Sequence, residues 1–323
     1  MSRTCLFKGI VFIVLFFILD VLIGQFLRLG NNKYFMEKSM SEFYRQRQNI
    51  DLLFMGSSHS YYHFNPFFFE KQLDVTAFNL GSSGQNPTST YFLLQEAFNH
   101  GHKPKVIVLE TSWRPLTGND TDFYSASRVF HAMRWSANKI GLFWHSFSFP
   151  SSLRLFSHTF RYRRNFSHFF LPSENTRKEK YRLNLTYIGK GFVTSPNKIT
   201  SENLIDHEFK DQKIEFNQYR ISYLKKTIRL ALENHTCVLG VISPLPPTVF
   251  ADIPNYRYIH QTIASIYESY GIKLLDLNII NQHTPIVEDI DFIDSHHLNS
   301  NGASKLDSYL AEYLQKTILS QCK

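Results

Sequence analysis

Short apolar runs alternate along this 323-residue chain with longer stretches whose apolar residues have helical spacing. The runs with strand character are each bordered by turn-forming residues; they cover residues 52–55, 75–80, 106–109, 237–242 and 272–275. The stretches with helical spacing cover residues 88–100, 216–234, 256–270 and 299–319. Strands that alternate with helices of this length predict an α/β fold: a three-layer α/β/α domain with a parallel sheet.

The N-terminal segment from Leu6 to Leu29 is almost wholly apolar. About 20 apolar residues suffice to span a bilayer as a helix. Because no small-residue cleavage site follows, we expect an uncleaved single-pass anchor rather than a signal peptide. Asp20 is costly inside lipid, and it either lies toward one end of the segment or pairs with a partner helix. Basic residues flank both sides, so charge leaves the orientation open.

The predicted organisation is a membrane anchor at 1–29, a linker at 30–49 and an α/β domain at 50–323. Within that domain, residues of about 114–213 mix aromatics, histidines and arginines without clean periodicity. This pattern predicts a helical and irregular insertion over the catalytic edge. Its cluster Arg161–Arg164 is either a solvated face or a site for a phosphate-bearing polymer or lipid headgroups.

The formal net charge is +8, with a pI near 9.2. No nucleic-acid motif accompanies this bias, so we predict no nucleic-acid partner and favour contact with an anionic membrane surface or envelope polymer. The three cysteines, Cys5, Cys237 and Cys322, are far apart, odd in number and without metal-ligand spacing. We therefore expect no disulfide framework, and the cysteines leave the redox compartment open.

The stretch Asp51–Ser60 carries the strongest chemical signal. Its apolar run ends at Gly56 and is followed by three serines and a histidine. The carboxyl end of a buried parallel strand would place a hydroxyl in the crevice where open α/β sheets bind ligands. A serine is a weak nucleophile alone and requires a base. Asp294-Ser-His-His-Leu-Asn299, near the other end of the chain, is the candidate source.

Three blocks together resemble the SGNH (GDSL-like) hydrolase superfamily. They are Gly56-Ser-Ser58, Asn79-Leu-Gly-Ser-Ser-Gly84 and Asp294-Ser-His-His297, the last followed by Leu-Asn-x-x-Gly-Ala through Ala303. The chain is similar in particular to the membrane-anchored branch that includes D-alanyl-lipoteichoic-acid transfer proteins and envelope-polysaccharide O-acetyltransferases. The resemblance covers residues 51–319 apart from the insertion, and it implies a flavodoxin-like sheet.

The resemblance also implies catalytic roles. Ser58, the third residue of Gly-Ser-Ser, corresponds to the nucleophile. The Asp-x-x-His spacing selects His297, rather than His296, as general base. Asp294 would then orient the imidazole and stabilise the imidazolium. One short loop can hold both members of this pair, so their mutual geometry is local.

The oxyanion hole implied by the resemblance consists of the backbone N–H groups of Ser58 and Gly84. Family members normally supply a third donor from an Asn after the third strand. Here the segment Glu110–Arg114 lacks that pattern. Ser112, or Asn86 from the neighbouring loop, could substitute.

These features predict a membrane-anchored serine esterase or acyltransferase that forms an acyl-Ser58 intermediate without metal or cofactor. A zinc site from His59, His63 and His297 is disfavoured because no ligand pattern is present. The expected partners are the bilayer, an envelope polysaccharide or acyl carrier as substrate, and a polytopic membrane acyltransferase. The resemblance, rather than the charge pattern, implies that the catalytic domain lies outside the cytoplasm. The alternative is a non-catalytic scaffold or polymer-binding partner of such an acyltransferase.

Overall fold

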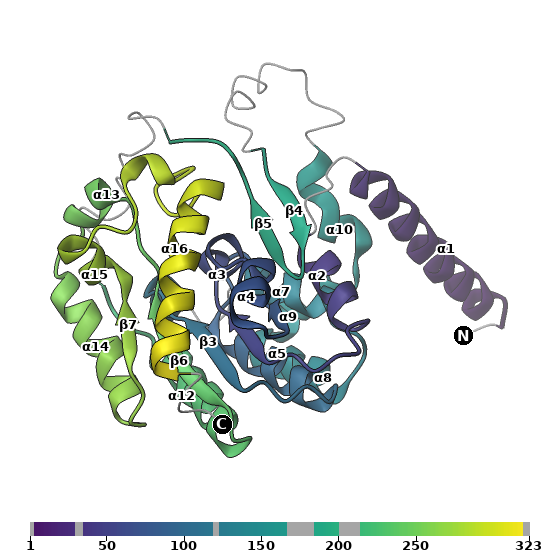
Figure 1. Ribbon diagram of the computed structural model, residues 1–323. Coiled ribbons are helices and arrows are strands. Elements are labelled where there is room, and N and C mark those ends of the chain that lie inside the picture. The colour runs from purple at the N-terminus through teal and green to yellow at the C-terminus, as the bar shows by residue number, and fades with distance from the viewer. Residues whose placement is uncertain (1–2, 30–34, 119–122, 167–183, 200–213, 319–323) are drawn as a thin grey trace. The chain divides into compact units, whose positions relative to one another are not determined.

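The computed structural model describes residues 3–29, 35–118, 123–166, 184–199 and 214–318 (Figure 1). Contacts group the chain into two compact units. The first unit is Met1–Tyr34 with Phe147–Arg182, and the second is Phe35–Ser146 with Leu183–Lys323.

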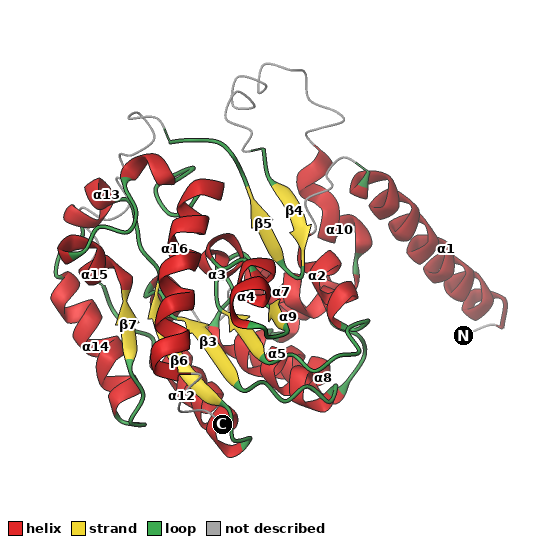
Figure 2. Cartoon of the chain, viewed as in Figure 1, coloured by secondary structure: helices red, strands yellow, loops and turns green. Residues whose placement is uncertain are grey.

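A five-stranded parallel sheet organises the second unit (Figures 1 and 2). Its strands are β1 (Leu52–Met55), β2 (Ala77–Asn79), β3 (Val106–Glu110), β6 (Cys237–Ile242) and β7 (Leu274–Asp276). They lie in the order β2-β1-β3-β6-β7, and each neighbouring pair is parallel. Counted within the sheet this is 2-1-3-4-5, the flavodoxin-like order, which confirms the predicted fold class. The order reverses beside β1, so a ligand crevice is expected at the carboxyl end of that strand.

Helices cover both faces of this sheet. The helices of the second unit, some of which pack on other helices rather than on the sheet, are α2 (Phe35–Phe43), α3 (Ser58–His63), α4 (Pro66–Leu73), α5 (Pro87–Asn99), α6 (Arg114–Thr117), α7 (Phe123–Ala132), α8 (Ala137–Ser146), α12 (Gln218–Glu233), α13 (Pro247–Ala251), α14 (Tyr256–Glu268), α15 (Leu277–His283), α16 (Ser300–Tyr313) and its continuation η6 (Leu314–Ile318). Leu239 and Val241 of β6 share one apolar core with α4 and α16. Gly240, between them, faces the other way, where Tyr267 of α14 covers it.

Part of the predicted insertion departs from the expected helical and irregular structure. Residues 184–199 contain an antiparallel hairpin, β4 (Thr186–Gly189) and β5 (Phe192–Thr194). Gly189, Lys190 and Gly191 all have positive φ and form its turn. The pattern was missed because a four-residue and a three-residue strand are too short to show alternation. The predicted linker contains α2, whose Met40 and Phe43 are fully buried in the second unit.

The cysteines depart from the expectation that no disulfide framework is present. Cys237, at the start of β6, is disulfide-bonded, whereas Cys5 is a free, exposed thiol. Cys322 lies outside the described residues. The expectation was wrong because sequence separation and an odd count do not fix distances in the fold, which alone decide whether two sulfurs can bond. Disulfides persist mainly in oxidising compartments.

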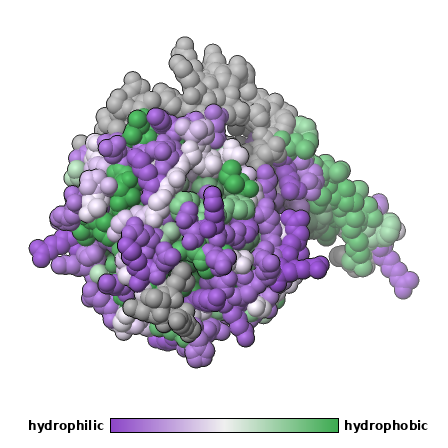
Figure 3. Space-filling view, in the orientation of Figure 1, coloured by the Kyte–Doolittle hydropathy of each residue, from purple (hydrophilic) through white to green (hydrophobic). Residues whose placement is uncertain are grey.

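The first unit contains the apolar N-terminal helix. Its elements are α1 (Arg3–Arg28), α9 (Phe149–Ser152), η1 (Leu153–Phe156), α10 (His158–Tyr162) and η2 (Arg163–Asn165). With a mean hydropathy of 2.8 in its most apolar window, α1 is long and apolar enough to cross a membrane, a property shared by signal sequences. Its surface is correspondingly apolar (Figure 3). Asp20 hydrogen-bonds within its own unit, to the start of α10, a partner that neither of the two expectations for this residue had named.

Asp307 on α16 is a buried carboxyl group whose protonation affects stability. Asp307 is 1% exposed, and among the described residues only Asn65 donates to its oxygens, through its backbone N–H at 3.3 and 3.4 Å. Burial raises the pKa of Asp307 well above 3.8. The folded state therefore retains a proton that the unfolded chain releases. This contribution to stability is fully present below pH 4 and is lost as the pH rises through the folded-state pKa.

Asp307→Asn, which cannot ionise, should be more stable than the wild type at pH 7. The difference should shrink toward pH 4, with a slope of up to about 1.4 kcal/mol per pH unit. Urea unfolding at several pH values measures it. A difference that is independent of pH would show that the ionised carboxylate is not the source.

Candidate active site

The turn after β1 places Ser58 at the carboxyl end of the sheet. Gly56 has a φ of +146°, and a Cβ built there would lie 2.7 Å from Glu110 Cβ and 2.8 Å from Glu110 O. Only glycine fits this backbone and this space. The chain turns sharply through Ser57 and enters α3 with Ser58 as its first residue.

A closed loop before α16 holds the predicted acid–base pair. Asp294 Oδ1 accepts hydrogen bonds from the backbone N–H groups of His296 and His297, each at 2.8 Å. The N–H of Ile293 donates to the carbonyl of His297 at 2.8 Å. The Asp-x-x-His spacing is therefore that of a compact turn, in which the carboxylate orders the backbone that carries its own histidine.

These residues meet although 239 positions separate Ser58 from His297. Ser58 Oγ lies 2.8 Å from His297 Nε2, and His297 Nδ1 lies 2.9 Å from Asp294 Oδ2. Burial alone would raise the pKa of Asp294, but the charge of His297 and the hydrogen bonds from the loop lower it to about 2. The geometry is that of a nucleophile, a base and an orienting carboxylate.

His63, on the last turn of α3, ties the two halves of the site together. Its Nε2 accepts a hydrogen bond at 3.1 Å from the backbone N–H of Leu298, the residue that follows His297. Burial, together with the nearby His59 and His297, lowers the pKa of His63 well below 6.5. A neutral His63 can accept this bond, so α3 carries both Ser58 and the anchor of the loop that faces it. Sequence reasoning considered His63 as part of a disfavoured zinc site and missed this role.

His296 occupies a different environment from its neighbour. Its Nε2 lies 3.1 Å from Arg114 Nη1. Burial, with repulsion from Arg114 and His59, lowers the pKa of His296 to about 3. The ring is thus neutral at physiological pH and accepts from the guanidinium, while the His297 ring faces Ser58.

The loop that carries Gly84 lies beside the Ser58 turn. The N–H of Ser82 donates to Gly56 O at 3.3 Å, and Ser60 Oγ donates to Asn79 Oδ1 at 3.0 Å. Gly84 itself has a φ of +63°. The first N–H groups of a helix have no intrahelical acceptor, so that of Ser58 is left for another acceptor. The oxyanion role of Ser58 and Gly84 stays a prediction.

The two substitute donors have structural contacts of their own. Asn86 Oδ1 accepts from the N–H of Ser89 at 2.9 Å and caps α5. The N–H of Ser112 donates to Glu110 Oε1 at 3.0 Å. Both residues are 3% exposed. Either of them as third oxyanion donor remains a prediction.

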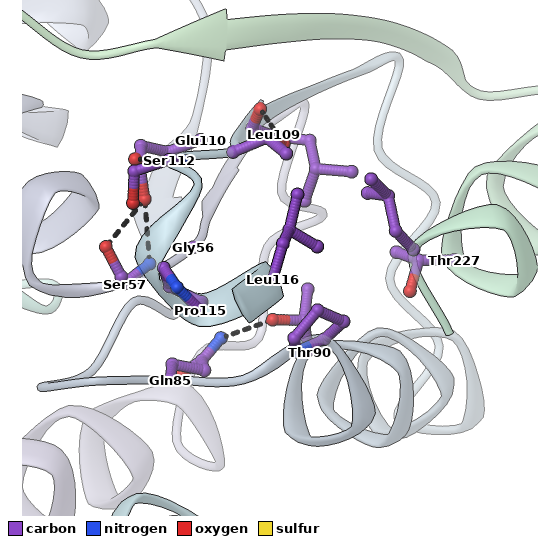
Figure 4. A pocket seen from close by; sticks show the side chains of 13 residues that line it. Gly56, Ser57, Gln85, Thr90, Leu109, Glu110, Ser112, Pro115, Leu116 and Thr227 are labelled. Carbon is purple, nitrogen blue, oxygen red and sulfur yellow. Dashed lines mark hydrogen bonds between the residues drawn. The ribbon is translucent and has the colours of Figure 1, made fainter. Parts of the chain in front are cut away.

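Glu110 fixes the turn before the nucleophile, and sequence reasoning missed it. Its Oε2 accepts from the N–H and the Oγ of Ser57, at 2.9 and 2.8 Å, and His59 Nδ1 lies 3.4 Å from its Oε1. Burial alone would raise the pKa of Glu110, but His59 and Ser57 lower it below 4.5. Figure 4 shows Ser57 and Glu110 on one side of a small cavity, with Thr227 on the opposite side. The sequence feature that could have identified Glu110 is an acidic residue at the end of an apolar run that forms a central strand.

Glu110→Gln tests this role. The amide keeps the volume but replaces one acceptor oxygen with a donor, so a buried N–H or O–H loses its partner. We expect a loss of about 2–3 kcal/mol of unfolding free energy, measured by urea denaturation at pH 7. The matched change Glu312→Gln, at an exposed residue paired with Lys316, should have no measurable effect. Equal stability of both variants would contradict the buried network.

Comparison with solved structures finds distant likenesses. No protein-family model matches the chain, and no curated protein sequence does. Solved structures with a TM-score of 0.43 include a candidate acylhydrolase from Bacteroides fragilis, 11% identical, covering 85% of this chain and 94% of that one. Others are a candidate platelet activating factor from Streptococcus pneumonia (12% identical; 86% and 92%) and a GDSL-like lipase from Bacteroides thetaiotaomicron (10%; 88% and 100%), both also at 0.43. No residue role follows from a likeness at this level.

Proposed function

We propose that this protein is a serine ester hydrolase or acyltransferase that works through an acyl-Ser58 intermediate. The observation that carries the proposal is the continuous hydrogen-bonded chain from Ser58 Oγ through the His297 ring to Asp294. Three residues in this relation form an activated nucleophile.

The first half-reaction forms the acyl-enzyme. Ser58 Oγ attacks the carbonyl carbon of an acyl ester while its proton passes to His297 Nε2. Asp294, ionised because its pKa is about 2, stabilises the imidazolium that results. The tetrahedral oxyanion would be bound by the N–H groups of Ser58 and Gly84, each contributing roughly 3 kcal/mol. Collapse expels the alcohol, which takes the proton from His297 Nε2.

The second half-reaction reverses these steps with a new nucleophile. His297 removes the proton from water or a carbohydrate hydroxyl, whose oxygen attacks the acyl carbon. Ser58 leaves as the alkoxide and regains its proton from the imidazolium. Water gives hydrolysis and the hydroxyl gives transfer, so the acceptor that reaches the acyl-enzyme decides the outcome.

We further propose that the site works at the outer side of the cell membrane on an acyl ester of an envelope polysaccharide or lipid. The apolar α1 supports a membrane anchor. The disulfide at Cys237 supports an oxidising compartment. A net charge of +8 favours anionic polymers or headgroups. A polytopic acyltransferase that supplies acyl groups is the proposed partner.

An acyl-trapping experiment tests the proposal. The protein is incubated with p-nitrophenyl acetate, quenched in acid and digested. We expect one acetyl group on the peptide that contains Ser58, and release of acetate or acetylated oligosaccharide when an oligosaccharide is added before quenching. Absence of both this adduct and of labelling by a fluorophosphonate probe would favour the non-catalytic scaffold.

A further inference from the structure

In the first unit, a polar cluster joins the middle of α1 to the start of α10. Asp20 Oδ1 accepts from Ser157 Oγ at 2.7 Å and from the N–H of Thr159 at 3.2 Å. Its Oδ2 accepts from the N–H of His158 at 2.7 Å. Thr159 Oγ1 donates to the carbonyl of Asp20 at 3.1 Å. The Asp20 carboxylate of α1 thus accepts hydrogen bonds from the first N–H groups of a second helix, α10.

The two segments remain in contact toward the end of α1. A Cβ built at Gly24 would lie 2.4 Å from His158 Cβ and 2.6 Å from His158 C, so the backbones approach as closely as glycine allows. Further along, Asn165 Nδ2 donates to the carbonyl of Leu27 at 2.9 Å. The segment therefore follows α1 over the length from Asp20 to Leu27.

The depth of these contacts follows from helix geometry. Asp20 precedes Arg28, the basic residue at the end of α1, by eight positions. At 1.5 Å per residue this is about 12 Å along the axis, well within a hydrocarbon layer of about 30 Å. A helix that spans the bilayer up to Arg28 thus places the start of α10 below the headgroups. There, uncapped N–H groups would cost several kcal/mol each, which explains why a carboxylate caps them.

The outer surface of this segment suits lipid. Phe149, Leu153 and Phe156 are 81%, 63% and 52% exposed. Guanidinium groups lie over neighbouring rings, with Arg163 3.6 Å from the Phe160 centroid and Arg161 5.0 Å from that of Tyr162. Exposed apolar side chains next to arginines that stack on aromatic rings are typical of segments that lie at the boundary between acyl chains and anionic headgroups.

We propose that residues 147–166 form a second membrane-inserted element, which dips into the leaflet on the Arg28 side and is held there by α1. The inference rests on the proposed membrane anchoring. Its occupant is the bilayer itself, because the segment packs along α1 and, like α1, exposes large apolar side chains.

Depth-dependent fluorescence quenching tests the proposal on the full chain. In a Cys5→Ser background, an environment-sensitive dye is attached to Phe156→Cys, to Phe16→Cys within α1, or to the exposed controls Leu232→Cys and Ile290→Cys. The protein is reconstituted in phosphatidylcholine–phosphatidylglycerol vesicles. We expect nitroxides on the acyl chains to quench the dyes at positions 156 and 16, and a water-soluble quencher to act on the two controls.

The outcomes separate this inference from the anchor. A dye at position 156 that behaves like the controls, while position 16 reports lipid, overturns the inserted segment alone. A dye at position 16 that reports water overturns the anchor and the inference with it. Gly24→Leu should move the position-156 dye to water and leave position 16 unchanged. Gly9→Leu is the matched control, since no described atom lies within 4 Å of a Cβ at Gly9. Insertion unaffected by Gly24→Leu would show that α1 does not hold the segment.

Discussion

Ser58→Ala should abolish covalent acyl transfer and lower kcat on an activated ester by roughly 10⁴- to 10⁶-fold. The hydroxyl is the sole reacting atom that the side chain supplies, and its contact with His297 Nε2 at 2.8 Å is the path for its proton. Alanine retains the backbone of α3 and the N–H at its first position. Binding and any oxyanion hole survive, and a residual rate above that of water is expected.

Ser57→Ala is the matched control for this prediction. Ser57 Oγ donates to Glu110, and in the alanine variant the Ser57 N–H would keep the second bond to the same carboxylate. Loss of one such bond is worth about 1–3 kcal/mol and should leave Ser58 reactive with a fluorophosphonate probe. Burst kinetics and mass spectrometry measure both variants. Acylation that persists in Ser58→Ala would show that Ser58 is not the nucleophile. Acylation that is lost in Ser57→Ala but not in Ser58→Ala would assign the nucleophile to Ser57.

The sheet was predictable because central parallel strands are buried on both faces. β6 matches its predicted bounds, Cys237–Ile242, and residues 106–109 lie within β3. Such strands appear as continuous apolar runs that need no partner to be recognised. The hairpin of β4 and β5 has no such run. Its strands are four and three residues long, and Thr186 and Ile188 are exposed.

The residues of the candidate site also divide into those that a local sequence pattern can show and those that it cannot. Asp294 and His297 contact each other within one turn, so a local motif can show them. Glu110 and His63 act through backbone N–H groups of segments distant in sequence, Ser57 and Leu298. A carboxylate or an imidazole that bonds a remote main chain leaves no spacing pattern, because its partner can be any residue type.

The contact between α1 and α10 shows a further limit of sequence reasoning. A carboxylate inside an apolar helix signals that some partner must exist. Nothing in the residue pattern selects Ser157–Thr159 over a helix of another protein, because backbone N–H groups at a helix start occur throughout the chain. The approach at Gly24 is equally hidden, since Gly9 in the same helix has no close neighbour among the described residues.

Asp294→Asn should lower kcat by about 10⁴-fold while leaving the fold intact. The amide oxygen can still accept the N–H groups of His296 and His297, so the loop keeps its shape. Its NH₂ group then faces His297 Nδ1. A donor at that place stabilises the tautomer in which Nε2 carries the proton, and Nε2 can no longer accept the proton of Ser58.

His296→Gln provides the comparison within the same loop. His296 is neutral and bonds Arg114, and its ring takes no part in the proton path, so we expect less than about a tenfold change in kcat. Steady-state kinetics on p-nitrophenyl acetate, with circular dichroism to verify folding, measures both variants. A folded Asp294→Asn enzyme within tenfold of the wild type would contradict the role of the carboxylate in setting the tautomer. An equal loss of kcat in His296→Gln would show that the structure of the loop, rather than the proton path through His297, limits the rate.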